Sequence, residues 1–271
     1  MNAVLKKIEN LGVALESLSK IKQGETSDTY LGIYDNKKII LKVYKDSKLK
    51  NEQNDFLHAN LMRQLSNLEL FPKIIHISDQ NDFFIYEYFK STSYEIDINF
   101  IKKLGYKLKE VHRTKPKVQI NTFYDEIKKY EIELGEENLK SIFGNLDLLI
   151  NQSKNENNQL VFSHNDLIKN NILFNKDICF IDYEYASLNN MHCDLARVID
   201  EFDLKKNDIK HLLDSYDYGE RTNFKNNIDL WNKINLYVDY IWILVMQKRG
   251  YLKKASKDHL KYLEKIRLLG Q

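Results

Sequence analysis

The sequence contains few of the residues that interrupt regular structure or crosslink a chain. It has 2 Pro and 9 Gly among 271 residues, too few for a disordered or fibrous protein. Its only cysteines, Cys179 and Cys193, have no nearby pair of histidines and form no metal-ligand pattern. We therefore expect a folded protein of one large domain or two lobes, with both cysteines packed in a reducing compartment.

Long hydrophobic runs and a surplus of one charge are also missing. The longest apolar run, 240–246, is far shorter than the roughly 20 residues of a spanning helix, and the first residues contain no signal-peptide pattern. Lys and Arg number 41 against 39 Asp and Glu, a net charge of +2, which is too small for binding a polyanion. We expect a cytoplasmic protein that neither inserts into membranes nor binds nucleic acid. Nothing in the sequence indicates an oligomeric state.

Apolar spacing predicts an α+β chain that changes character near Tyr88. Before this residue we predict a helix, two strands joined by an Asp35-Asn36 turn, a second helix and at least one further strand. After it the pattern is mainly helical, with one polar loop. The predicted elements are helices over 4–18, 51–65, 100–111 and 231–246, strands over 29–33, 38–44 and 83–89, and a loop over 151–159.

The densest chemical signal is the segment SHNDLIKNNILFNKDICFIDYEY, residues 163–185. His164 and Asp166 are followed by Asn171 and, after a predicted hairpin of strands 172–174 and 178–181, by Asp182. The hairpin places Asn171 and Asp182 at its two open ends. Carboxylate and amide oxygens that converge there suit Mg²⁺ beside phosphates, and the spacing matches a kinase catalytic loop. The alternative is a hairpin with surface Asn and Asp, which the full set of four residues makes less favourable.

A second signal is Lys42, which interrupts the apolar strand KKIILKVYK. Its side chain lies on the face opposite Leu41 and needs an anion. Glu52 on the following helix is a candidate ion-pair partner that would hold Lys42 toward nucleotide phosphates. Asp55 competes for that role, and Glu52 can also be read as an ordinary exposed helix residue.

The turn QGETSDTYLG precedes this strand and can approach a phosphate closely. Gly24 permits close backbone approach, and Thr26 and Ser27 offer hydroxyl donors. The chain has neither a GxGxxG nor a GxxxxGK[ST] pattern, which disfavours a protein kinase and a P-loop enzyme.

These motifs together resemble the choline/ethanolamine kinases, within the broader aminoglycoside phosphotransferase-like superfamily. The resemblance is carried by HNDL at 164–167, NIL at 171–173, IDYEYA at 181–186, Asn189 and DLA at 194–196. It implies a two-lobe protein-kinase-like fold with a small β-containing, ATP-binding N-lobe over 1–88. A mainly helical C-lobe over 89–271 would carry catalysis and substrate binding.

The resemblance also implies roles for individual residues. Asp166 would be the catalytic base for the acceptor hydroxyl, and Asn171 and Asp182 would bind Mg²⁺. Lys42 would hold the ATP phosphates, and Asp194 would brace the catalytic loop. The backbone around Glu87 and Tyr88 would contact adenine. Glu184 would lie at the rim of the metal or substrate site.

A quaternary ammonium acceptor requires aromatic faces and carboxylates, because it donates no hydrogen bonds. The candidates are Tyr185, Tyr240 and Trp242, with Glu184 and Glu201 for negative charge. Alignment on Gln247 leaves Trp242 one position away from where the family has a tryptophan, so Tyr240 and Trp242 can equally be core residues. Lysines are frequent after residue 205, which disfavours a polycationic aminoglycoside as acceptor.

The sequence thus predicts an ATP- and Mg²⁺-dependent kinase that converts choline to phosphocholine. The alternatives are phosphorylation of ethanolamine, thiamine or an aminoglycoside, and a nucleotide-binding pseudokinase. Retention of Lys42, Asp166, Asn171 and Asp182 together argues against the pseudokinase.

Overall fold

The computed structural model describes residues 8, 15–24, 27–45, 59–78, 82–92, 95–135, 139–154, 160–219, 222–252, 262 and 264–266. The chain forms two compact units, and neither is a single stretch of sequence. The first comprises Met1–Tyr94, Pro116–Gln119 and Ile172–Glu184, and the second comprises Glu95–Lys115, Ile120–Asn171 and Tyr185–Gln271. The lobe boundary predicted at Tyr88 stays a prediction.

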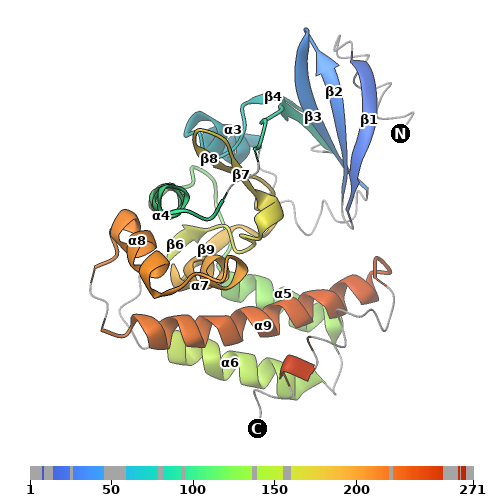
Figure 1. The fold of residues 1–271 in the computed structure, drawn as a ribbon. Helices are drawn as coiled ribbons and strands as arrows, with labels where there is room; N and C mark the ends of the chain where they lie inside the picture. Colours follow the sequence, from blue (N-terminus) through green and yellow to red (C-terminus); the bar gives the residue numbers. More distant parts are fainter. Residues whose placement is uncertain are drawn as a thin grey trace. The chain divides into compact units, whose positions relative to one another are not determined.

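The first unit is built on a five-stranded antiparallel sheet of order β1-β2-β3-β5-β4 (Figure 1). Its strands are β1 (Glu16–Gln23), β2 (Ser27–Tyr34), β3 (Lys37–Tyr44), β4 (Ile74–Ile77) and β5 (Phe83–Glu87). Helix α3 (Ala59–Asn67) and the hairpin of β7 (Ile172–Phe174) and β8 (Ile178–Phe180) complete the unit. The Asp35-Asn36 turn is confirmed: both residues have positive φ, 50° and 57°, as a two-residue hairpin turn requires.

The three strands predicted here are confirmed as β2, β3 and β5, although β5 ends at Glu87. The helix predicted over 4–18 is wrong for residues 16–18, which begin β1. The pairing of β1 with β2 shifts register between Glu16 and Ser19. Leu15 and Leu18 therefore both pack against the hydrophobic core, although residues three apart in a regular strand face opposite sides. Apart from Ile8 and Leu15, the rest of that prediction lies outside the described residues, as do positions 51–58 of the second predicted helix.

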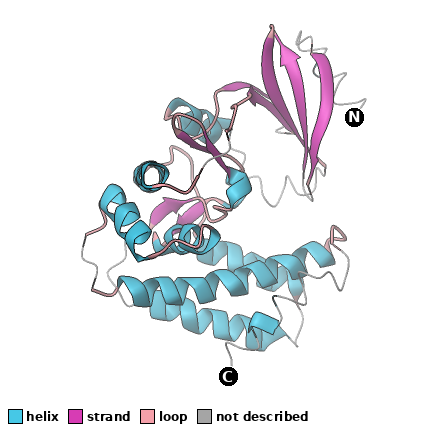
Figure 2. Cartoon of the chain, viewed as in Figure 1, coloured by secondary structure: helices cyan, strands magenta, loops and turns pink. Residues whose placement is uncertain are grey.

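The second unit is mainly helical (Figure 2). Its helices are α4 (Ile98–Arg113), α5 (Phe123–Leu134), α6 (Lys140–Lys154), α7 (His192–Glu201), α8 (Lys206–Tyr216) and α9 (Phe224–Lys248), with short paired strands β6 (Val161–Ser163) and β9 (Ser187–Asn189). The side chain of Asp97 caps α4 by accepting a hydrogen bond from the Phe100 amide at 2.7 Å. The predicted helices over 100–111 and 231–246 are confirmed within α4 and α9.

The predicted loop over 151–159 is wrong for residues 151–154, which continue α6. Their polar composition hides a helical period, because Ser153 is buried in line with Leu146 and Ile150. The Ser153 hydroxyl is satisfied by donating to the Ile150 carbonyl at 2.7 Å. Residues 155–159 lie outside the described part of the chain.

The predicted α+β class with a β-containing first part is confirmed. Cys179 and Cys193 are buried and form no disulfide among the described residues, as expected of packing residues. Across the described residues, no helix combines the length and the apolar character that membrane crossing requires.

Candidate active site

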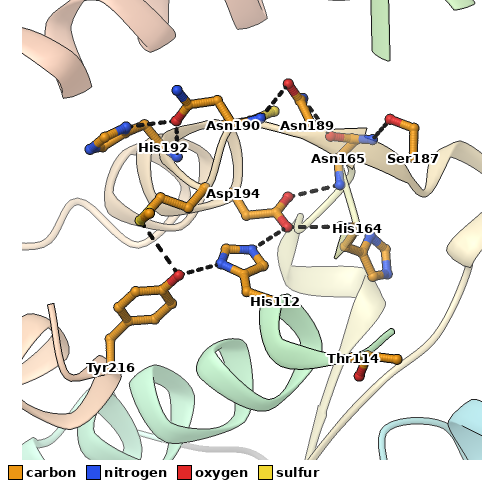
Figure 3. Close-up of polar contacts among 12 residues, drawn as sticks. His112, Thr114, His164, Asn165, Ser187, Asn189, Asn190, His192, Asp194 and Tyr216 are labelled. Atoms are coloured by element: carbon orange, nitrogen blue, oxygen red, sulfur yellow. Dashed lines mark hydrogen bonds and ion pairs between the residues drawn. The ribbon is translucent and has the colours of Figure 1, made fainter. Parts of the chain in front are cut away.

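The loop that follows β6 is held by one buried carboxylate on α7. Asp194, fully buried, accepts hydrogen bonds from the amides of His164 and Asn165, each at 2.8 Å (Figure 3). Asn165 has φ 64°, so the loop turns sharply just before Asp166. The bracing role that the resemblance implies for Asp194 is confirmed.

Asp194 is itself fixed by His112 at the end of α4. The His112 ring contacts Asp194 Oδ2 through Nε2 at 3.0 Å and the Tyr216 hydroxyl through Nδ1 at 2.6 Å (Figure 3). Burial alone would raise the pKa of Asp194, but the hydrogen bond and charge of His112 and the loop amides lower it below its ordinary value. Asp194 is therefore ionised at neutral pH.

Asp166 and Asn171 meet within the second unit. Asn171 ends a short 3₁₀ turn (Lys169–Asn171) and is 1% exposed. Its Nδ2 donates to the Asp166 carboxylate at 2.8 Å and to the Asp166 carbonyl at 2.9 Å. Both donors of the Asn171 amide are thus directed at Asp166, and its Oδ1 is the atom left to bind a cation.

Lys42 and Asp182 meet within the first unit, where Glu184 joins them. The buried Lys42 ammonium contacts Asp182 and lies 2.5 Å from Glu184 Oε1. Burial alone would lower the pKa of Lys42, but the two carboxylates raise it well above its ordinary value. Burial would raise the pKa of Asp182, and the charge and hydrogen bond of Lys42 bring it below the ordinary value. Burial raises the pKa of Glu184, and the nearby Asp182 adds to this against the opposing Lys42.

The donor chemistry of Asn171 and Asp182 fits a magnesium ion. Asp182 is an ionised carboxylate, and Asn171 retains an amide oxygen, which are the hard oxygen ligands Mg²⁺ takes alongside phosphates. Among the described residues, no group of three or more His, Cys, Asp or Glu side chains could hold a metal ion. Phosphate oxygens would therefore have to supply further ligands.

Strand register shows one further cation that the sequence reading missed. Lys22 pairs with Thr29, and Thr29 pairs with Lys42, so their side chains share one face of the sheet. The charge of Lys22 also contributes to the lowered pKa of Asp182. The position of Lys22, two residues before Gly24, was the sequence signal that could have found it.

The other predicted nucleotide contacts are only partly described. Gly24 donates its amide to the Ser27 carbonyl at 2.9 Å, forming a tight turn. The amides of Glu87 and Tyr88 donate within the sheet, to the Lys73 and Lys38 carbonyls. Thr26 and Glu52 lie outside the described residues.

The predicted acceptor residues differ in their surroundings. Trp242 donates its indole N–H to the Tyr185 hydroxyl at 2.7 Å, and the two rings meet edge to face. Tyr240 points instead into the core, at 4% exposed. Glu201 accepts a hydrogen bond from the Lys169 amide at 2.9 Å.

An ion pair on the Trp242 side of α9 also escaped the sequence reading. Asp239, three residues before Trp242, accepts hydrogen bonds from the two terminal guanidinium nitrogens of Arg197 on α7, at 2.6 and 2.8 Å. The spacing of three between Asp239 and Trp242 was the available signal, because it puts both on one helix face.

Comparison with known proteins identifies the family to which this geometry belongs. Residues 19–229 match the model of the choline/ethanolamine kinases. The chain belongs to the choline/ethanolamine kinase family. It is therefore an ATP-dependent phosphotransferase that acts on a small molecule of the amino alcohol class.

Individual proteins are similar to this chain in sequence or in fold. A LicA homolog from Mycoplasma capricolum subsp. capricolum is 27% identical over 227 residues, which are 83% of this chain and 87% of the relative. The choline kinase LicA from Streptococcus pneumoniae has the same fold, with a TM-score of 0.78, 19% identity and coverage of 98% of this chain and 96% of the other. The ADP-bound aminoglycoside phosphotransferase APH(2'')-Ib gives a TM-score of 0.66 at 17% identity, covering 98% and 97% of the two chains.

Proposed function

We propose that this kinase transfers the γ-phosphoryl group of ATP to the hydroxyl of choline, giving phosphocholine and ADP. The observation that carries the proposal is the pairing of Asp166 with Asn171, in which one amide donates twice to the aspartate and keeps its oxygen for a cation. Catalysis of phosphoryl transfer rests mainly on such positioning and on charge stabilisation.

In this proposal Asp166 orients the acceptor hydroxyl and takes its proton as the oxygen attacks phosphorus. Asn171 holds the Asp166 carboxylate in one rotamer through its amide donors. Lys42 binds the phosphates of ATP, exchanging contacts with Asp182 and Glu184 for phosphate oxygens. Asn171 Oδ1 and the Asp182 carboxylate are the oxygen ligands that the family resemblance assigns to Mg²⁺, which when bound would neutralise charge on the phosphates.

Choline is supported by the aromatic corner of Tyr185 and Trp242. Their edge-to-face arrangement offers ring faces to a quaternary ammonium, the group that needs them most. The corner has two rings because Tyr240 lies in the core. Glu201, near the loop of Asp166, supplies carboxylate charge.

The acceptor is tested by measuring ADP release with Mg²⁺-ATP and choline, ethanolamine, thiamine or kanamycin. We expect the highest kcat/KM with choline. A higher value with ethanolamine would replace choline in the proposal, and no turnover with any acceptor would favour a pseudokinase.

The role of Asp166 is tested by Asp166→Asn, which keeps the shape of the side chain and removes its basicity. We expect turnover to fall at least about a thousand-fold, within the range attributed to a positioned base together with its orienting effect. ATP binding, measured by calorimetry, should stay within about two-fold of wild type. Retained turnover would exclude Asp166 as the base.

A further inference from the structure

Asn165, between His164 and Asp166, connects the catalytic loop to the aromatic corner. Strands β6 and β9 pair from Val161 with Asn189 to Ser163 with Ser187. Continued by two residues, this register would set Asn165 opposite Tyr185. The ladder instead ends at Ser163, because Asn165 turns into the left-handed region, with φ 64°.

The side chain of Asn165 forms hydrogen bonds to residues of the opposite segment at the point where the backbone pairing of β6 with β9 ends. Its Nδ2 donates to the Tyr185 carbonyl and to the Ser187 hydroxyl, both at 2.7 Å. Its Oδ1 accepts from Asn189 Nδ2 at 2.8 Å. Figure 3 shows the side chain reaching Ser187 and Asn189 while its backbone amide bonds to Asp194. Both donors and the acceptor of the amide are used.

Tyr185 is consequently fixed at both ends. Its carbonyl is held by Asn165, and its hydroxyl accepts from Trp242. Because Asn165 is also the residue before Asp166, one side chain connects the aspartate to the aromatic pair through hydrogen bonds of 2.7 Å.

We propose that Asn165 is a positioning residue that sets the place of the Tyr185–Trp242 pair relative to Asp166. This inference rests on the proposed function, in which Asp166 meets the acceptor hydroxyl and the aromatic pair meets its cationic end. Asparagine fits this position for two reasons. It tolerates the left-handed backbone conformation, and its side-chain amide replaces the backbone hydrogen bonds that continued pairing of β6 with β9 would have made.

The test compares Asn165→Gly with wild type in steady-state kinetics. Glycine keeps the left-handed backbone accessible and removes only the side-chain bonds. We expect the KM of the amino alcohol to rise about ten-fold and kcat to fall, with the KM of ATP within two-fold of wild type. Asn36→Gly, at the left-handed Asn of the β2–β3 turn, is the matched control and should leave all three constants unchanged.

Asn165→Asp separates the side-chain role from the backbone role. Aspartate also tolerates this backbone but places a carboxylate oxygen against the Tyr185 carbonyl, so we expect a larger loss than with glycine. Wild-type acceptor kinetics in both variants would overturn the inference, as would an equal rise in the KM of ATP.

Ser187→Ala removes a single partner and keeps the inference testable if both Asn165 variants unfold. We expect its acceptor KM to rise about three-fold at unchanged KM for ATP; unchanged acceptor kinetics would contradict the inference. A wild-type protein that turns over neither choline nor ethanolamine would overturn the proposed function and this inference with it. Normal turnover by Asn165→Gly would overturn the inference alone.

Discussion

Lys42 stays charged inside the protein because two carboxylates face it. An isolated ammonium at 6% exposure would be strongly disfavoured, and Asp182 and Glu184 reverse this. The sequence indicated that Lys42 needs an anion, and it proposed Glu52. Sequence spacing could not indicate Asp182 and Glu184 as its partners, because they lie 140 and 142 residues away in the chain.

At the residue scale we predict that Lys22 strengthens binding of the nucleotide phosphates. Lys22→Gln should weaken ATP binding about five-fold, which corresponds to roughly 1 kcal/mol for one charge near the surface. Binding of adenosine should not change, because adenosine has no phosphate. Isothermal calorimetry with both ligands measures the difference.

Lys20 is the matched control on the same strand. It pairs with Tyr30 across the sheet, on the opposite face, and forms an ion pair with Asp28 at 2.8 Å. Lys20→Gln should therefore bind ATP as wild type does. Equal losses in the two variants would mean that the sheet face does not matter and that only net charge does.

At the scale of elements, the contact between α4 and α8 depends on Gly105. A Cβ at this position would lie 2.4 Å from the Leu212 carbonyl oxygen and 3.1 Å from Ser215 Cβ, both on α8. The helices approach closely because Gly105 has no side chain. The apolar period predicted α4, but it could not show which helix packs against this glycine.

Gly105→Ala should destabilise the protein by about 2 kcal/mol, because the backbone of α8 must shift. Gly144→Ala on α6 provides the contrast: nothing lies within 4 Å of a Cβ there, so alanine should stabilise by about 0.5 to 1 kcal/mol. Chemical denaturation of both variants measures the two values. A loss of stability in Gly144→Ala as large as in Gly105→Ala would contradict the packing argument.

The elements that the sequence mispredicted have a common physical cause. At 16–18, the shift in register of β1 produces an apolar spacing that resembles a helix. At 151–154, the polar residues continue α6, and the buried residue among them is a serine. In both places the local sequence was compatible with two structures, and tertiary packing decided between them.

At the scale of the whole molecule, motif spacing predicted the catalytic loop and the family but not the hydrogen bonds that shape the site. The brace of Asp194 followed from the resemblance. The bonds of Asn165 and the pair of Arg197 with Asp239 did not, because they depend on three-dimensional register between segments that no motif relates.

The buried carboxylates predict how stability responds to acid. Asp182 and Asp194 have pKa values below the ordinary 3.8, so their stabilisation is present above pH 3.8 and is lost as pH falls through their folded values. Glu184, with a pKa above 4.5, acts in the opposite sense. The effect of Glu184 falls between its raised folded pKa and 4.5, above the range of the two aspartates, so we expect the free energy of unfolding to fall as pH decreases below about 4.

Asp194→Asn isolates one of these contributions. We expect it to lower the free energy of unfolding by about 3 kcal/mol at pH 7, since it weakens several charge-assisted hydrogen bonds at once. The difference from wild type should shrink as pH falls below 3.8, where wild-type Asp194 also takes up a proton. Urea denaturation at a series of pH values measures this, and a difference independent of pH would show that the charge of Asp194 does not matter.

The division of the chain into interleaved units restricts how this enzyme can be recombined with its relatives. Residues Ile172–Glu184 belong to the first unit and carry both carboxylates that neutralise Lys42. A chimaera that exchanged only residues 1–94 would pair one protein's lysine with another's acids. Exchanges that move both segments together keep the surroundings of this ion-paired cluster from one parent, so we expect single-crossover chimaeras to be less stable than those that exchange both segments.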